Sequence, residues 1–121
     1  MSAPLAITMG DASGIGPEIV LRRFCEGGLG DDVVVYGDAS ILRHGASLLG
    51  LDVDWGRLPI VDLALLTAAD HRPGQLDAAS GAAARAYVER ATRDALAGTV
   101  AGIVTMPMNK VREVRWYLVE S

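Results

Sequence analysis

The stretch PLAITMGDASGIGPEIVLRRF at residues 4–24 decides the fold, because it joins an apolar run to a helix through a glycine-rich loop. PLAIT lacks polar alternation, which is typical of a strand buried on both faces of a sheet. PEIVLRRF predicts a helix, since Pro17 suits the first helical position and Glu18 complements the positive helix start. Gly27 and Gly28 mark its end.

Three further segments predict strands. DVVVYG at 32–37 and VAGIVTMP at 100–107 are typical of buried strands, and Pro107 would end the second. PIVDLALL at 59–66 predicts a strand in a less periodic region, and HRPG at 71–74 predicts a turn.

Two further helices are expected between these strands. The first covers residues 39–50, with Asp38 as its N-cap and Gly50 as its end. The second covers residues 76–96, where alanines at 79, 82, 83, 86 and 95 form a narrow face before Gly98. Because strands alternate with helices, we expect an α/β fold with a mainly parallel sheet, flanked by helices and connected by right-handed crossovers.

Composition and charge exclude several classes of function. The 121 residues are 50% hydrophobic and 21% charged, as in globular proteins, and the net charge of −4 offers no basic field for nucleic acid. Cys25 is the only cysteine, so it cannot form an internal disulfide. With no apolar run of about 18 residues and no leader pattern, we expect a cytoplasmic protein with no membrane partner.

The loop GDASGIG at 10–16 lies where open α/β sheets bind ligands, between a strand end and a helix start. It is not a dinucleotide fingerprint, because GxGxxG would require glycine where Ile19 stands, and it lacks the Gly-Lys-Ser/Thr ending of a phosphate loop. Its glycines suit either a tight turn or a ligand loop, and periodicity does not separate the two.

Two groups of residues are candidates for one cleft. The first is Gly10, Asp11, Gly14 and Gly16. Within it, Asp11 suits either a hydrogen bond from a ligand hydroxyl or a cap on the following helix.

The second group is Thr105, Asn109 and Lys110, in TMPMNK at the end of the last predicted strand. Lys110 would offer its charge to a phosphate, although a strand ended by proline and a solvated lysine is the simpler explanation of the segment. His44 and His71 have no His, Cys or acidic partner at metal-ligand spacing. We therefore expect both to be surface or helix-packing residues and expect no metal site in this chain.

Four ordered blocks resemble the 4-hydroxythreonine-4-phosphate dehydrogenase (PdxA) family. They are LAITMGDASGIGPEIVLR, VVVYGDASILRHGASLLGL, PGQLDAASGAAARAYVERA and AGIVTMPMNK, and together they span residues 4 to 110. The first differs from the family's Gly-Asp-Pro-Ala-Gly-Ile-Gly-Pro-Glu at Ala12 and Ser13, and the last is similar to its Thr-x-Pro-x-Asn-Lys segment. Four matches in order are far more specific than one glycine loop.

The resemblance implies a fold similar to that of isocitrate and isopropylmalate dehydrogenases, in a homodimer. It also implies NAD-dependent oxidation and decarboxylation of 4-phosphohydroxy-L-threonine in pyridoxal phosphate biosynthesis, with a divalent metal that stabilises the enolate. A related subgroup acts on four-carbon phosphorylated sugar acids such as 4-phospho-threonate and 4-phospho-erythronate, and these blocks do not separate the two.

The chain departs from the family after Lys110. The family continues with a Gly-His-Thr-Glu motif and then three metal-binding histidines, whereas this chain reads VREVRWYLVES and stops. We therefore expect residues 1–110 to be an N-terminal α/β segment and residues 111–121 a divergent tail, as a frameshift, premature stop or gene-prediction fragment would produce. No catalytic residue can be assigned, and the chain alone is expected to be an inactive fragment or an interaction module.

Overall fold

Four parallel strands form one sheet in the order β3-β2-β1-β4. They appear in a computed structural model that describes residues 3–75 and 78–106. The strands are β1 (Leu5–Thr8), β2 (Val33–Gly37), β3 (Ile60–Asp62) and β4 (Gly102–Thr105). In the central register, Leu5 of β1 lies between Val33 of β2 and Gly102 of β4. The predicted parallel α/β fold is confirmed.

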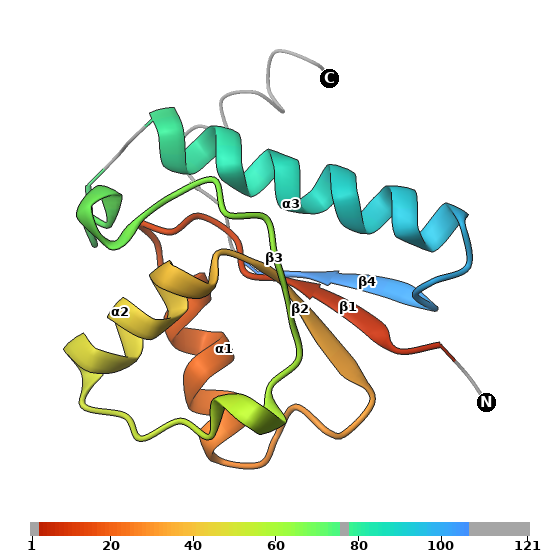
Figure 1. The fold of residues 1–121 in the computed structure, drawn as a ribbon, viewed down its shortest axis with the longest axis horizontal. Coiled ribbons are helices and arrows are strands. Elements are labelled where there is room, and N and C mark those ends of the chain that lie inside the picture. Colours follow the sequence, from red (N-terminus) through yellow and green to blue (C-terminus); the bar gives the residue numbers. More distant parts are fainter. Residues whose placement is uncertain (1–2, 76–77, 107–121) are drawn as a thin grey trace, which may run out of the picture.

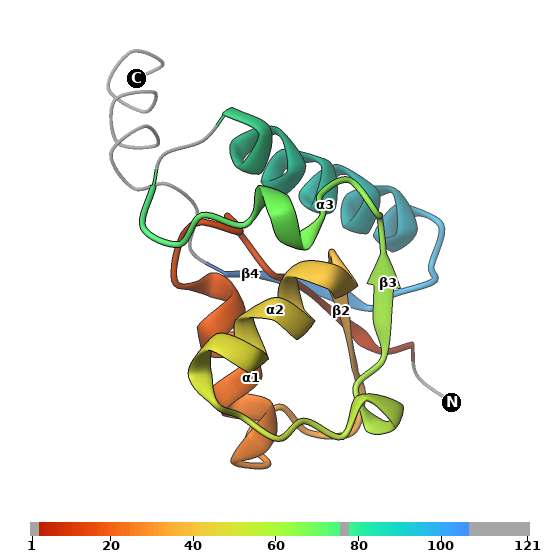
Figure 2. The same cartoon turned by 60° about the vertical axis from the view of Figure 1, so that its left-hand side comes forward.

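Helices cover both faces of this sheet (Figure 1). α1 (Gly16–Cys25) and α2 (Ala39–Leu49) pack together on one face, and α3 (Ala78–Leu96) lies across β1, β2 and β4 on the other (Figure 2). Two short 3-10 helices, η1 (Trp55–Arg57) and η2 (Ala68–Asp70), flank β3 along the chain. The core between these layers is built largely from Met9, Leu21, Tyr36, Ile41, Leu42 and Tyr87.

The helix signals in the sequence are largely confirmed. α1 has proline in its first turn and Glu18 beside it, and α2 ends at Gly50 in the left-handed conformation, with φ of 68°. α3 ends shortly before Gly98, whose φ is 82°. Its buried face differs from the predicted alanine face, because it follows Ser80, Ala83, Ala84, Tyr87 and Ala91, while Ala79 and Ala82 are exposed.

Two predicted strands are shorter or more exposed than expected. β3 stops at Asp62 because the Asp62 carboxylate accepts a hydrogen bond from the Ala64 backbone N–H, 3.0 Å away, and Ala64 turns to a φ of 52°. β4 lies at the edge of the described sheet, so it is not the buried strand that was predicted, and Val104 is 43% exposed. An apolar run alone cannot distinguish a central strand from an edge strand.

The predicted capping role of Asp38 is wrong in its chemistry. Asp38 occupies the N-cap position of α2, but its side chain makes no capping hydrogen bond there. The Asp62 carboxylate accepts the hydrogen bond from the Ala39 N–H instead, over 3.2 Å. The Asp38 side chain instead accepts hydrogen bonds from α3 and from the segment after β3.

Candidate functional site

The glycine loop and the end of β4 meet at the carboxyl end of β1, where the order in which the chain adds strands to the sheet reverses. From β1 the chain adds β2 and β3 on one side, with α1 and α2 on one face. It then returns through α3 on the other face to add β4 on the opposite side of β1. Ligands of open α/β sheets bind beyond the carboxyl ends of the strands at such a point.

Close contacts confirm that the two segments are neighbours. The Met106 backbone N–H, directly after β4, donates to the Thr8 carbonyl at the end of β1 over 3.0 Å. A Cβ atom at Gly16 would lie 3.1 Å from the Met106 Cβ. Thr105 is exposed beside Thr8, its register partner. Asn109 and Lys110, the other predicted members of this group, lie outside the described residues.

The three loop glycines have different physical roles. Gly10 has a φ of 76°, which side chains rarely adopt, and a Cβ at Gly16 would lie 2.0 Å from the Met9 carbonyl oxygen. These two glycines are therefore required by the turn itself. Gly14 is exposed, and a Cβ there would lie 3.5 Å from its closest neighbour, the Asp11 carbonyl. Gly14 is thus the loop glycine that the protein's own packing does not require.

Asp11 is a turn-forming residue in this structure. It is only 4% exposed, and its carboxylate accepts a hydrogen bond from the Ser13 backbone N–H over 2.8 Å. The N-cap position of α1 is occupied by Ile15, and no side chain caps the helix. Asp11 therefore does not cap α1, and the first-turn N–H groups of this helix lack a side-chain acceptor among the described residues.

Two other parts of the chain hold the loop in place. The Gly74 N–H donates to the Ser13 carbonyl over 2.7 Å, and the Ser13 hydroxyl lies 3.3 Å from that of Ser80 at the start of α3. Beneath the loop, Thr8 is buried and its hydroxyl has no hydrogen-bond partner within the described residues. The exposed part of the loop is limited to Gly14 and Ile15.

Sequence reasoning missed a buried carboxylate beside this edge. Asp38, fully buried at the end of β2, accepts hydrogen bonds from the N–H groups of Leu65 and Leu66, at 2.7 and 3.0 Å, and from the Tyr87 hydroxyl. Burial and this bond raise the pKa of Tyr87. Asp38 follows a buried strand, as Asp11 does, so the same sequence signal marks it as a candidate site residue. The predicted capping role concealed this signal.

The two histidines, predicted as surface or helix-packing residues, lie against each other, a contact that the sequence did not predict. The Nδ1 atoms of His44 on α2 and His71 after η2 lie 2.8 Å apart, with the rings in an edge-to-face arrangement. No sequence signal links two histidines 27 positions apart. The described residues contain no group of three or more potential metal ligands from histidine, cysteine, aspartate and glutamate. The described residues therefore do not form a divalent-metal site by themselves.

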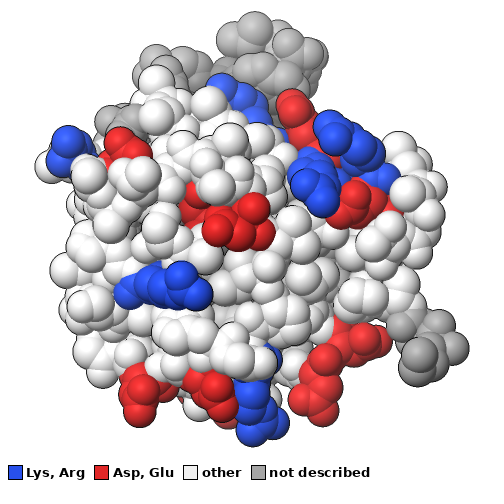
Figure 3. All heavy atoms as spheres, in the orientation of Figure 1, with Lys and Arg blue, Asp and Glu red and all other residues white. Residues whose placement is uncertain are grey.

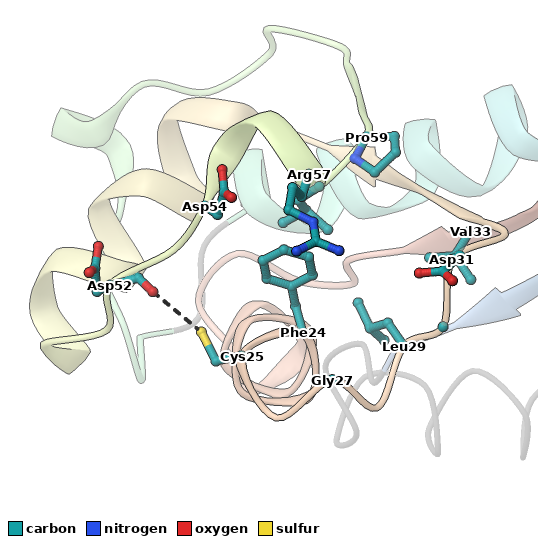
Figure 4. Close-up of a pocket in the computed structure, with 12 residues that line it drawn as sticks. Phe24, Cys25, Gly27, Leu29, Asp31, Val33, Asp52, Asp54, Arg57 and Pro59 are labelled. Carbon is teal, nitrogen blue, oxygen red and sulfur yellow. Dashed lines mark hydrogen bonds between the residues drawn. The ribbon is translucent and has the colours of Figure 1, made fainter.

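A separate pocket lies at the other end of the sheet, beside the segments that lead into β2 and β3. Its volume is about 370 Å³. Figure 4 shows Arg57 reaching towards its middle, with Asp52 and Asp54 on one side and Asp31 on the other. Because it lies at the amino ends of the strands, this pocket is not the predicted cleft.

Surface charge is mixed, and no described helix is suited to a bilayer. On the face in Figure 3, acidic and basic side chains are interspersed, in agreement with a chain that lacks a basic field. Even α3, with 19 residues, does not have the length and apolarity needed to span a membrane, nor do the other helices that the structure describes.

Comparisons with known proteins agree with the geometry. The family model "Pyridoxal phosphate biosynthetic protein PdxA" matches residues 30–113. The 4-hydroxythreonine-4-phosphate dehydrogenase of Hydrogenobaculum sp. is 37% identical over 86% of this chain and 36% of its own length. The D-threonate 4-phosphate dehydrogenase of Pectobacterium atrosepticum is 34% identical over 91% of this chain and 38% of its own length.

Solved structures have the same fold. The crystal structure of 4-hydroxythreonine-4-phosphate dehydrogenase from Klebsiella pneumoniae superposes with a TM-score of 0.79 and 37% identity, over 91% of this chain and 38% of that one. The Burkholderia phymatum enzyme gives 0.77 and 29% identity, over 91% and 38%. This chain therefore spans well under half the length of the relatives it matches, and it belongs to the PdxA family.

Proposed function

We propose that this chain forms one wall of a dehydrogenase cleft that oxidises and decarboxylates 4-phosphohydroxy-L-threonine with NAD, in pyridoxal phosphate biosynthesis. The observation that supports this most directly is that the glycine loop and the end of β4 lie together where the strand order reverses, between β1 and β4. Family membership supplies the reaction class. The proposal concerns a full-length protein, since the chain spans 36% of its Hydrogenobaculum relative. Family resemblance alone suggests a homodimer.

Within this cleft, the exposed loop rim would bind the anionic parts of the ligands. Gly14 leaves space above the loop, and the first turn of α1 offers N–H groups without a side-chain cap among the described residues. Helix N-termini of this kind bind phosphate through backbone N–H groups and the helix dipole. Gly10, Asp11 and Gly16 would shape this rim, and Thr105 would face it from the end of β4. Asn109 and Lys110 lie outside the described residues, and we propose that Lys110 pairs with a phosphate of the ligand.

The described residues do not supply the metal site that the family reaction implies. The family reaction implies a divalent metal, but the described residues lack a set of three candidate ligands. We therefore assign no step through a metal to this chain, and its ligands would belong to the part of the relatives that this chain does not match.

A second candidate function is the dehydrogenation of four-carbon phosphorylated sugar acids. The Pectobacterium D-threonate 4-phosphate dehydrogenase is 34% identical, close to the 37% of the Hydrogenobaculum enzyme, so identity does not separate the two substrates. Both substrates carry a phosphate and an oxidisable hydroxyl, so the same loop rim would serve either. A third candidate, an inactive interaction module, is favoured by the outer edge of β4, which pairs with no other strand among the described residues.

A chimera tests the dehydrogenase proposal. Residues 1–110 would replace the corresponding segment of the Klebsiella pneumoniae relative, and NADH formation would be followed with each substrate and a divalent metal. We expect turnover by the chimera and none by the 121-residue chain. A folded chimera that oxidises neither substrate, beside an active parent enzyme, would contradict the proposal, and the preferred substrate would separate the first two candidates.

A further inference from the structure

The His44–His71 pair is the titratable cluster that the proposed cleft does not use. Both rings are partly buried, and their Nδ1 atoms are 2.8 Å apart. A hydrogen bond at this distance requires a proton on one Nδ1 and a lone pair on the other. A neutral or singly protonated pair can therefore keep this bond, and a pair in which both rings are protonated cannot.

The position of His71 is fixed from both sides. Just before it, Asp70 and Thr67 form a capping box, in which Asp70 accepts from the Thr67 N–H and hydroxyl over 2.9 Å. Farther back, the Ser40 hydroxyl of α2 donates to the Leu66 carbonyl over 2.8 Å. Just after it, the Gly74 N–H binds the Ser13 carbonyl. His71 therefore stands between α2 and the glycine loop.

The partners of the two rings indicate which one donates. His71 forms a hydrogen bond with the Ala12 backbone, and because this bond raises the pKa, the imidazole is the donor. With Nδ1 facing His44, the nitrogen left for Ala12 is Nε2, which makes Nδ1 of His71 the acceptor. Burial and then the charge of His44 lower the pKa of His71 overall, which agrees with a neutral ring.

We propose that the His44–His71 hydrogen bond is a pH-sensitive contact that holds residues 71–75 against the glycine loop and releases them when both rings are protonated. In the doubly protonated pair, both Nδ1 atoms carry hydrogens, so the bond is lost and two positive charges face each other. Release of His71 would remove the support for the Gly74–Ser13 bond. The exposed rim of the loop would then change shape with pH.

No acidic side chain offsets this repulsion among the described residues. Asp70 is committed to Thr67, and Asp11 to the Ser13 N–H. The loop contributes the Ala12 backbone, and α2 contributes His44 itself, with Gly45 next to the His71 ring. Of the neighbouring arginines, Arg43 lies over the Trp55 ring and Arg72 acts on Asp70.

The direction of the pH effect follows from the lowered pKa. The unfolded value of histidine is about 6.5, so the contribution of His71 is complete above that pH and is lost as the pH falls below it. If release takes up one proton, the opening equilibrium should rise by at most about tenfold per pH unit in this range.

Amide hydrogen exchange on the purified 121-residue chain tests the proposal. The Gly74 N–H reports the bond to Ser13, and the Val35 N–H, bound to the Pro59 carbonyl, reports opening of the sheet. After correction for intrinsic exchange rates, protection of Gly74 should fall several-fold more than that of Val35 between pH 7.5 and 5. Equal losses at both amides would overturn the proposal, because the pair would then affect global stability alone.

Two substitutions at one position separate protonation from packing. His44→Asn cannot take up a charge, and its amide can donate to neutral His71 or, after rotation, accept from protonated His71, so Gly74 should stay protected at both pH values. His44→Leu removes the donor, so Gly74 should be poorly protected at both. In His44→Asn the pKa of His71 should also rise towards 6.5, as followed by NMR, because the neighbouring charge is gone. A pH-dependent loss that persists in His44→Asn would contradict the proposal.

Discussion

Tyr87 donates a hydrogen bond to Asp38 and thereby joins the middle of α3 to the carboxyl end of β2. Asp38 is fully buried, and its other carboxylate oxygen accepts the N–H groups of Leu65 and Leu66. One side chain thus ties together β2, α3 and the segment that follows β3. A buried carboxylate is tolerated in this place because each oxygen has a donor.

Tyr87→Phe should reduce the free energy of unfolding by about 1–3 kcal/mol, because it leaves one buried Asp38 oxygen without a donor. The measurement is urea denaturation at pH 7. Tyr36→Phe is the matched control, since Tyr36 is equally buried but donates over 2.6 Å to Asp94, which also faces Arg90 near the surface. Its loss should be smaller, and equal losses would contradict the special role of Asp38.

Alkaline pH should destabilise the protein through Tyr36. Burial and the hydrogen bond to Asp94 raise the pKa of Tyr36 from 10.0 to about 12. Because the folded pKa is higher than the unfolded one, this stabilisation is complete below pH 10 and is lost as the pH rises towards 12. Over these two units the loss should be about 2–3 kcal/mol.

Denaturation series at pH 9 to 12 would measure this effect. Tyr36→Phe should lose less stability over that range than the unmodified chain, by about 1.4 kcal/mol per pH unit. Tyr87, whose pKa is also raised, is present in both proteins and so cancels from the comparison. Parallel pH curves for the two proteins would show that Tyr36 does not titrate as expected.

Local signals in the sequence predicted much of the fold, because they act over a few residues. Pro17 and Gly50 mark helix ends through backbone geometry that the residue itself imposes. The rule for strand carboxyl ends placed the glycine loop and Thr105 on one edge, where the structure has them. These inferences did not require knowledge of contacts between distant parts of the chain.

Contacts between distant segments could not be predicted in this way. The partners of Asp38 are 27, 28 and 49 positions away, and His71 is 27 positions from His44. The exposure of β4 depends on strand order, which its own apolar residues do not encode. The role of Asn109 and Lys110 stays a prediction, since both lie outside the described residues.

Asp11→Asn should separate a role in the cleft from a role in folding. Asparagine keeps a side-chain oxygen that can accept the Ser13 N–H, so the turn should survive. In the chimera described above, turnover should fall more than the melting temperature if the negative charge serves the ligands. Matched losses of activity and melting temperature would instead assign Asp11 to the turn alone.

Gly16→Ala should be far more damaging than Gly14→Ala, although both remove a glycine from the same loop. The added Cβ at Gly16 would lie 2.0 Å from the Met9 carbonyl oxygen, which is backbone and cannot rotate away. We expect a loss of about 3 kcal/mol or more in unfolding free energy, or failure to fold.

At Gly14 the added Cβ would lie 3.5 Å from the Asp11 carbonyl, an ordinary contact, so stability should change by about 0.5 kcal/mol or less. Urea denaturation of both variants measures the difference. If Gly14 leaves space for a ligand, Gly14→Ala in the chimera should raise the KM for NAD or the phosphorylated substrate while the fold stays intact. A Gly14→Ala chimera with unchanged kinetics would place the ligands elsewhere on this edge, and a destabilised one would show that the turn requires all three glycines.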